Sequence, residues 1–217
     1  MVSAELGLHC DLLEINPFLV WFAKVKASTY SAEVRDNTRQ LAQEIVKHVI
    51  ATEDRNDLWI PDLHNIERWW SSDNLQFLAK LRFSIYKACP DACSERDLLW
   101  VAFCRIMIDT SNAAFNHQSM SFKPVSSQLS LFPRDATSQH LDRFVALADQ
   151  ICEDAAQPLK GSVRVTYADS RCVPLSPETS YDCVITSPPY PNRMSYIREL
   201  RPYLYWSQHI QESREPG

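Results

Sequence analysis

The sequence contains very little glycine and no long apolar run. Its 217 residues include three glycines, Gly7, Gly161 and Gly217, whereas average usage of about 7% would give roughly fifteen. A Gly-rich nucleotide-binding loop cannot be built from so few. No apolar run approaches the ~20 residues that cross a bilayer, and the N-terminus lacks the basic-then-apolar order of a signal peptide. We therefore expect a globular protein of the cytoplasm with no membrane partner.

Positive charge and paired cysteines are also scarce. The net charge is −5 and the sequence pI about 5.7, so any contact with nucleic acid must be local. Seven cysteines at irregular spacing suit a reducing compartment better than a disulfide framework. Cys89 and Cys93 do not form a CxxC pair and no second pair follows, so we expect no metal site.

The two ends of the chain carry strand patterns. Leu8–Glu14 predicts a short strand, and Asn16 followed by Pro17 predicts the N-cap and first residue of a helix. Towards the other end, Val163–Tyr167 and Tyr181–Ile185 predict two more strands. Strands with an intervening helix are typical of an α/β sheet.

The middle of the chain, from about residue 31 to 157, has a helical period almost throughout. Its apolar stripes are Leu41, Ile45 and Val49; Leu75, Leu78, Arg82 and Ile85; Leu98, Val101 and Ile108; and Leu141, Phe144, Val145, Ala148 and Cys152. We expect Trp59, Trp69, Trp70 and Trp100 to be core or packing residues rather than platforms on which bases stack. Near the C-terminus, residues 192–201 predict a helix. Pro202 either ends this helix or begins another one.

These patterns predict an α/β fold with a large helical insertion. We expect residues 1–30 to form one strand and helix of the sheet, residues 31–160 to form the helical insertion, and residues 161–217 to return to the sheet.

The stretch Thr186-Ser187-Pro188-Pro189-Tyr190 has the chemistry of a catalytic loop for an exocyclic amino group. Such an amino group is a weak nucleophile, and acceptors placed around its N–H groups assist its reaction. A serine hydroxyl and a backbone carbonyl both accept hydrogen bonds, and two prolines hold the loop stiff. Tyr190 offers a flat ring on which a base rotated out of the duplex can stack. The alternative is a polyproline ligand over Pro188–Pro191, but its place directly after a strand pattern favours the catalytic interpretation.

Three predicted strands each end near a polar side chain of useful type: Glu14, Asp169 and Ser187. In an open parallel sheet, ligands bind outside the carboxyl ends of the strands. One crevice can therefore receive all three. Taken alone, Glu14 is also consistent with a solvated acid in a turn.

At this point the chain resembles the amino-group DNA methyltransferases, which use S-adenosyl-L-methionine to modify cytosine at N4 or adenine at N6. The run Ser-Pro-Pro-Tyr-Pro-Asn-Arg-Met-Ser-Tyr is similar to one bacterial branch of modification methylases. The resemblance implies that Ser187, Pro188, Pro189 and Tyr190 are catalytic. Serine before the prolines favours cytosine N4, with adenine N6 as the alternative.

The resemblance also implies a partial Rossmann-like methyltransferase sheet and a cofactor site. Glu14, with Ile15 and Asn16, falls where the family binds the ribose hydroxyls of S-adenosyl-L-methionine, and Asp169, with Ser170, falls where it contacts the adenine. No metal is implied. The helical insertion falls where a target-recognition region for double-stranded DNA is expected, as in the transferases of restriction-modification systems.

The family's Phe-x-Gly-x-Gly-type loop, which wraps the methionine part of the cofactor, has no counterpart upstream of Glu14. Met1–Gly7 instead looks like the helix that follows that loop. We therefore expect a fragment, or one part of a split enzyme, whose partner is a complementing methyltransferase chain or a cognate restriction endonuclease. A competing hypothesis is a non-catalytic DNA- or protein-binding module with a vestigial methyltransferase sheet.

Overall fold

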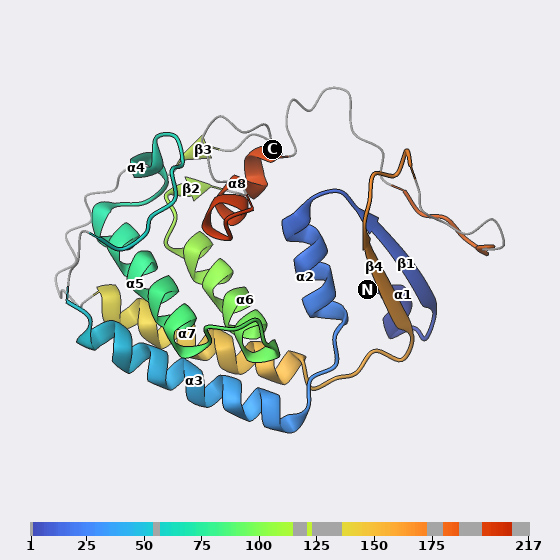
Figure 1. The fold of residues 1–217 in the computed structure, drawn as a ribbon, viewed down its shortest axis with the longest axis horizontal. Coiled ribbons are helices and arrows are strands. Elements are labelled where there is room, and N and C mark those ends of the chain that lie inside the picture. Colours follow the sequence, from blue (N-terminus) through green and yellow to red (C-terminus); the bar gives the residue numbers. More distant parts are fainter. Residues whose placement is uncertain are drawn as a thin grey trace.

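The computed structural model describes residues 2–53, 57–114, 121–122, 136–172, 180–186 and 197–209. Within them the chain forms a mixed α/β fold with eight helices and two small two-stranded sheets. Figure 1 shows a block of helices at one side of the molecule and a pair of parallel strands at the other, with one helix between them. The predicted α/β class agrees with this arrangement, whereas the two parallel strands described do not establish the predicted Rossmann-like sheet.

The parallel sheet pairs two strands from opposite ends of the chain. Strand β1 (His9–Glu14) pairs with β4 (Ser162–Tyr167), and the register places His9 opposite Ser162 and Glu14 opposite Tyr167. The short helix α1 (Val2–Glu5) precedes β1. Both strands lie where the sequence predicts them.

Two glycines lie at the start of this sheet. The backbone N–H of Gly161 donates to the carbonyl of Ala4 at 2.8 Å, and a Cβ on Gly161 would lie 2.0 Å from the carbonyl oxygen of Leu8. Gly7 has φ +94°, in the left-handed region that favours glycine. Gly161 is thus required by the close approach of the chain before β4 to the chain before β1, and Gly7 suits the left-handed turn that precedes β1.

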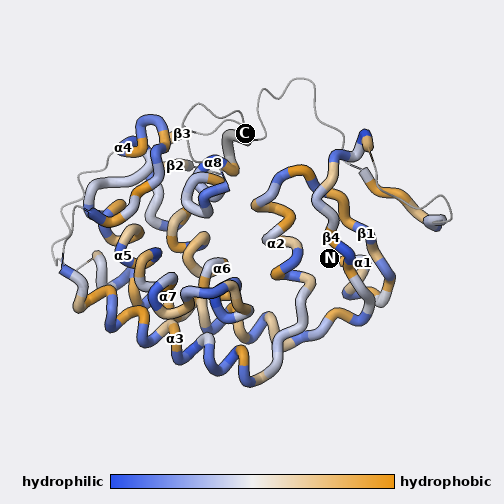
Figure 2. Tube along the Cα trace, in the orientation of Figure 1, coloured by the Kyte–Doolittle hydropathy of each residue, from blue (hydrophilic) through white to orange (hydrophobic). Residues whose placement is uncertain are grey.

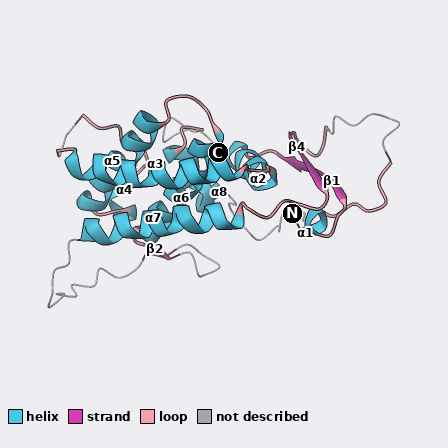
Figure 3. Ribbon diagram, turned by 90° about the horizontal axis from the view of Figure 1, so that it is seen from below, coloured by secondary structure: helices cyan, strands magenta, loops and turns pink. Residues whose placement is uncertain are grey.

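Helix α2 (Pro17–Ala27) connects the sheet to the helical block, as Figure 3 also shows. The Asn16 side chain caps it by accepting from the N–H groups of Phe18 and Leu19 at 3.0 and 3.3 Å. The helix carries apolar residues on most of its surface, which is typical of a helix packed on two sides. It contacts both strands on one side and the helical block on the other, where the Trp21 indole donates to Asp97 at 2.9 Å.

The helical block is built from four long helices that pack on one another. They are α3 (Ala32–Ala51), α5 (Ser72–Ala88), α6 (Ser94–Asp109) and α7 (Ala136–Asp154). Ser31 and Ser71 cap α3 and α5 with their hydroxyl groups. A short helix α4 (Ile66–Trp69) and a two-residue hairpin pair, β2 (Ala113–Ala114) with β3 (Ser121–Phe122), lie at the end of the block.

The core of the block is rich in aromatic rings. Trp69, Trp70 and Trp100 are buried, as predicted, whereas Trp59 is 39% exposed and packs edge-to-face on the buried Trp206 ring. Helix α8 (Ile197–Trp206) adds its last three residues, Leu204, Tyr205 and Trp206, to the same core. The segment that follows the Ser-Pro-Pro-Tyr motif is therefore anchored in the helical block.

Two predictions about the C-terminal part are wrong. Residues 180–186 form no strand, and Val184 and Ile185 are 80% and 87% exposed. Figure 2 shows this apolar segment at the far right of the view, away from the packed parts of the molecule. The chain is also helical through Pro202, which lies inside α8 rather than at an end.

None of the helices in the described ranges has the length and apolar content needed to span a bilayer.

Candidate functional site

Parallel pairing brings two of the predicted site regions to one edge of the sheet. The N–H of Ala168, directly after β4, donates to the backbone carbonyl of Glu14 at 3.1 Å. Asp169 is the next residue along the chain. Glu14 and Asp169 therefore lie at neighbouring carboxyl ends of two parallel strands, which is the edge where α/β sheets bind ligands.

The Glu14 carboxylate is held by the start of helix α2. Its Oε1 accepts the backbone N–H of Asn16 at 2.7 Å, and no described residue hydrogen-bonds its Oε2. Ile15, between them, is 58% exposed. Because the Asn16 side chain is occupied in capping α2, the free acceptor here is Glu14 and the free apolar surface is Ile15.

Asp169 is folded onto its own loop. Its carboxylate accepts from the backbone N–H of Arg171 at 2.9 Å and from the Arg171 guanidinium, with the shortest contact 2.6 Å to Nη2. These hydrogen bonds lower the pKa of Asp169 to about 2. Asp169 is therefore ionised at neutral pH and can accept further hydrogen bonds. Ser170 is exposed beside it.

The chain that leads to the predicted catalytic motif is tied to β1 by one contact. The Tyr181 hydroxyl donates to Asp11 Oδ2 at 2.5 Å, which raises the pKa of Tyr181. Ser187, Pro188, Pro189 and Tyr190 lie outside the described residues. The structure thus brings together the two predicted cofactor regions, Glu14–Asn16 and Asp169–Ser170, and describes the approach to the motif.

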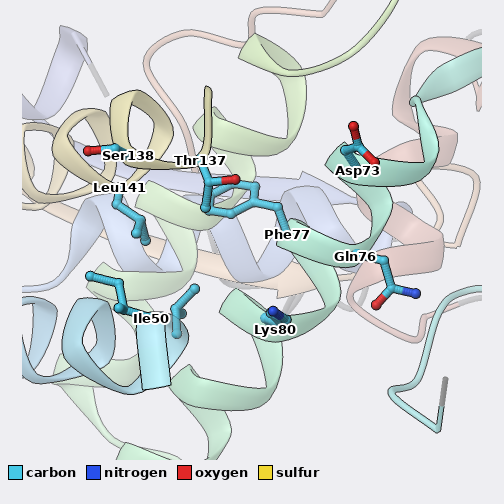
Figure 4. Close-up of a pocket in the computed structure, with 9 residues that line it drawn as sticks. Ile50, Asp73, Gln76, Phe77, Lys80, Thr137, Ser138 and Leu141 are labelled. Carbon is cyan, nitrogen blue, oxygen red and sulfur yellow. The ribbon is translucent and has the colours of Figure 1, made fainter. Parts of the chain in front are cut away.

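The helical block contains two pockets that none of the predicted site residues lines. The larger, about 480 Å³, lies among α3, α5 and α7. Figure 4 shows Phe77 and Leu141 on its apolar side, with Thr137 from α7 close to Phe77. A smaller pocket of about 360 Å³ is lined by Trp59, Arg82 and Gln208 among others.

Arg82 was detectable in the sequence because it occupies a position in an otherwise apolar helical stripe with Leu75, Leu78 and Ile85.

Cys89 and Cys93 show no comparable pattern that would indicate a functional site. Burial raises the pKa of Cys89 to about 11, so its thiol is protonated. In the ranges that the structure describes, no three His, Cys, Asp or Glu side chains come together in a way that would hold a metal ion.

Comparison of this chain with protein-family models, with curated proteins and with solved structures finds no match.

Proposed function

We propose that this protein is part of an S-adenosyl-L-methionine-dependent DNA methyltransferase that modifies an exocyclic amino group, with cytosine N4 favoured over adenine N6. The observation that carries the proposal is the parallel pairing of β1 with β4. It places the Glu14 carboxylate and the Asp169 loop at one sheet edge, although 154 residues separate them in the chain.

The residues at this edge fit the nucleoside part of the cofactor. The unpaired Oε2 of Glu14 suits the ribose hydroxyls, the exposed Ile15 suits the face of the adenine, and the ionised Asp169 suits its amino group. The described residues contain no comparable site for the methionine part. When bound, the cofactor would supply an electrophilic methyl group.

By its chemistry and its resemblance to the family motif, the Ser-Pro-Pro-Tyr segment would hold the target base. The Ser187 hydroxyl and the Pro188 carbonyl would accept from the two N–H groups of the amino nitrogen, which raises the electron density of its lone pair. Tyr190 would stack on the rotated base. The nitrogen would then take the methyl group in line as the methyl–sulfur bond of the cofactor breaks, and it would release one proton to water, with no covalent intermediate on the protein.

A complete sheet would require further strands. No residue of β1 or β4 is fully buried, although parallel sheets are normally covered on both faces. The Glu14 carbonyl accepts a hydrogen bond from the β4 side. Backbone groups point alternately to the two sides of a strand, so those of Asp11 and Leu13 point to the side of β1 that faces away from β4. No described strand pairs with that edge. A complementing methyltransferase segment that adds a strand there is our proposed partner.

The test is transfer of labelled methyl groups to DNA by the chain joined to, or coexpressed with, a segment that carries the Gly-rich loop and its strand. We expect Ser187→Ala and Tyr190→Ala to lose at least 100-fold in rate, with unchanged circular dichroism. Ser94→Ala, an exposed position at the start of α6, is the matched control. Full activity in both motif variants would show that the loop is assigned wrongly.

Base-resolved methylation mapping on the same DNA would then distinguish N4-methylcytosine from N6-methyladenine.

The second candidate is a non-catalytic binding module, which is favoured by the contrast between a well-packed helical block and a sheet without buried residues. Absence of methyl transfer in every complemented form would support it. Calorimetry of the 217-residue chain with S-adenosyl-L-methionine adds a second reading. Tight binding by the chain alone would contradict the need for a complementing loop.

A further inference from the structure

The smaller pocket of the helical block, termed here the Arg82 pocket, combines a cation with exposed aromatic rings. It lies where the end of α8 meets α5, and it is lined by Trp59, Ala79, Arg82, Phe83, Tyr86 and Gln208. Its volume of about 360 Å³ is within the range of small-ligand sites. None of its residues belongs to the candidate cofactor site around Glu14 and Asp169.

Arg82 is held rigidly and has no acidic partner among the described residues. Its guanidinium carbon lies 4.0 Å from the ring centroid of Trp59 and 4.7 Å from that of Tyr86, and its Nε donates to the carbonyl of Trp206 at 3.4 Å. Burial lowers its pKa, and the group that offsets this effect is the Tyr86 side chain rather than a carboxylate. Five other arginines of the described chain pair with aspartates. A fixed arginine without a counter-ion is suited to an external anion.

Two aromatic rings beside Arg82 remain partly open to solvent. Trp59 is 39% and Phe83 38% exposed, whereas the other tryptophans of the block are buried. Exposed rings next to an arginine are the usual means of binding a nucleic-acid strand, since the arginine binds phosphate and the rings contact base or sugar.

Gln208 contributes a polar residue to the pocket lining. It follows α8 in a Schellman motif, in which its N–H donates to Tyr205 and the His209 N–H donates to Leu204, at 3.1 and 2.9 Å. Its φ of 60° lies in the left-handed region, where glycine is the favoured residue. The helix C-cap accounts for this conformation. The glutamine amide lines the pocket and can donate to a phosphate or a base edge.

The pocket is also connected to the catalytic motif. Helix α8 begins at Ile197, seven residues after Tyr190, and ends at the pocket. Along the chain, α8 therefore lies between the motif and the pocket, and residues 187–196 lie outside the described residues.

We propose that the Arg82 pocket binds a backbone phosphate of the substrate DNA, with Arg82 on the phosphate, Gln208 on an adjoining oxygen and Trp59 against the neighbouring sugar or base. This inference rests on the proposed DNA-methyltransferase function and deepens it. It assigns a DNA contact to the helical block and links that contact to the catalytic motif through α8.

The test is fluorescence anisotropy with a labelled 20-base-pair duplex of mixed sequence, titrated between 50 and 200 mM salt. For Arg82→Gln we expect about ten-fold weaker binding at low salt, and a slope of log K against log salt that is smaller by about 0.9, the loss of one phosphate contact. Arg82→Lys keeps the charge and should keep the slope. The matched control is Arg39→Gln on α3, which removes the same charge from a side chain already paired with Asp36 and Asp149.

Gln208→Gly separates an effect on stability from an effect on DNA binding. Relief of the left-handed strain should raise the melting temperature by a few degrees, while loss of the amide should weaken DNA binding several-fold. Unchanged DNA affinity in this variant would overturn the role of Gln208.

The outcomes separate the two proposals. Wild-type protein that binds DNA, with equal slopes for Arg82→Gln and Arg39→Gln, would overturn the phosphate site and leave the proposed function standing. Wild-type protein that binds no DNA at any salt concentration, alone or complemented, would overturn both.

Discussion

Two neighbouring tryptophans in the helical core should respond differently to the same substitution. Trp70 and Trp206 are both fully buried, and their ring centroids are 6.0 Å apart in an edge-to-face arrangement. The Trp70 indole N–H donates to the carbonyl of Met107 at 2.9 Å. The Trp206 indole N–H has no partner in the described structure. Replacement by phenylalanine removes similar volume at both sites, so the difference between the two variants reports the hydrogen bond.

The expected difference follows from what each substitution leaves behind. Trp70→Phe removes the indole donor of the Met107 carbonyl, in the last turn of α6, and leaves that carbonyl the longer hydrogen bond from the Thr110 hydroxyl at 3.3 Å, so the loss costs about 1 kcal/mol. Trp206→Phe removes a buried N–H that has no acceptor, and so it removes the free-energy cost of burying that group, which is of similar size. We expect Trp70→Phe to be the less stable variant by about 2 kcal/mol, or roughly 4–8 °C in Tm for a chain of this size.

Urea unfolding followed by circular dichroism at 222 nm measures both free energies of unfolding. Trp206→Ala serves as a reference, because the loss of a fully buried ring should cost about 3–5 kcal/mol. Equal stability of the two phenylalanine variants, or a less stable Trp206→Phe, would refute this account of the core.

Three further predictions concern the sheet and two titrating side chains. Gly161→Ala should abolish protection of the β4 amides in hydrogen exchange, because its Cβ would lie 2.0 Å from the Leu8 carbonyl oxygen; retained protection would contradict the tight contact. Arg171→Ala should raise the pKa of Asp169 from about 2 towards its ordinary value near 3.8, as measured by carboxyl NMR titration, and a value that stays near 2 would show that another group holds it. The folded-state pKa of His48 is lowered by burial and by a nearby lysine; since the unfolded chain binds the proton first, stability should fall as pH drops through about 6.5. Thermal melts from pH 8 to 5 should show this fall in the wild type and a smaller one in His48→Gln.

The elements predicted best from the sequence are those with local signals. Asn16 and Pro17 mark the start of α2, and the cap hydrogen bonds are those that this residue pair favours. The apolar stripe of α7 was likewise visible, and Leu141, Phe144, Ala148 and Cys152 are buried. These features depend on residues a few positions apart.

The errors arise where the structure depends on distant partners. Tyr181–Ile185 has a strand pattern, but a strand requires a neighbouring edge, and the described sheet pairs β1 only with β4. Pro202 was expected to interrupt a helix, yet α8 continues through it because buried neighbours such as Leu204 and Trp206 fix the helix in the core.

In the candidate site, the strand-end positions of Glu14 and Asp169 followed from the sequence. Their hydrogen bonds to Asn16 and Arg171 did not, because those depend on loop geometry. The predicted roles of these residues stay predictions until cofactor binding is measured.

The pairing of β1 with β4 also constrains the order of folding. About 150 residues separate the two strands, and closing a loop of that length costs about 4 kcal/mol of chain entropy before any contact is made. The helical block reduces this cost, because Tyr30 at its start and Cys152 near its end pack in one small cluster. With the block folded, the effective loop is far shorter and the cost falls by roughly 1.5 kcal/mol. The helices should therefore fold first, and the sheet should form only after they have brought its two strands together.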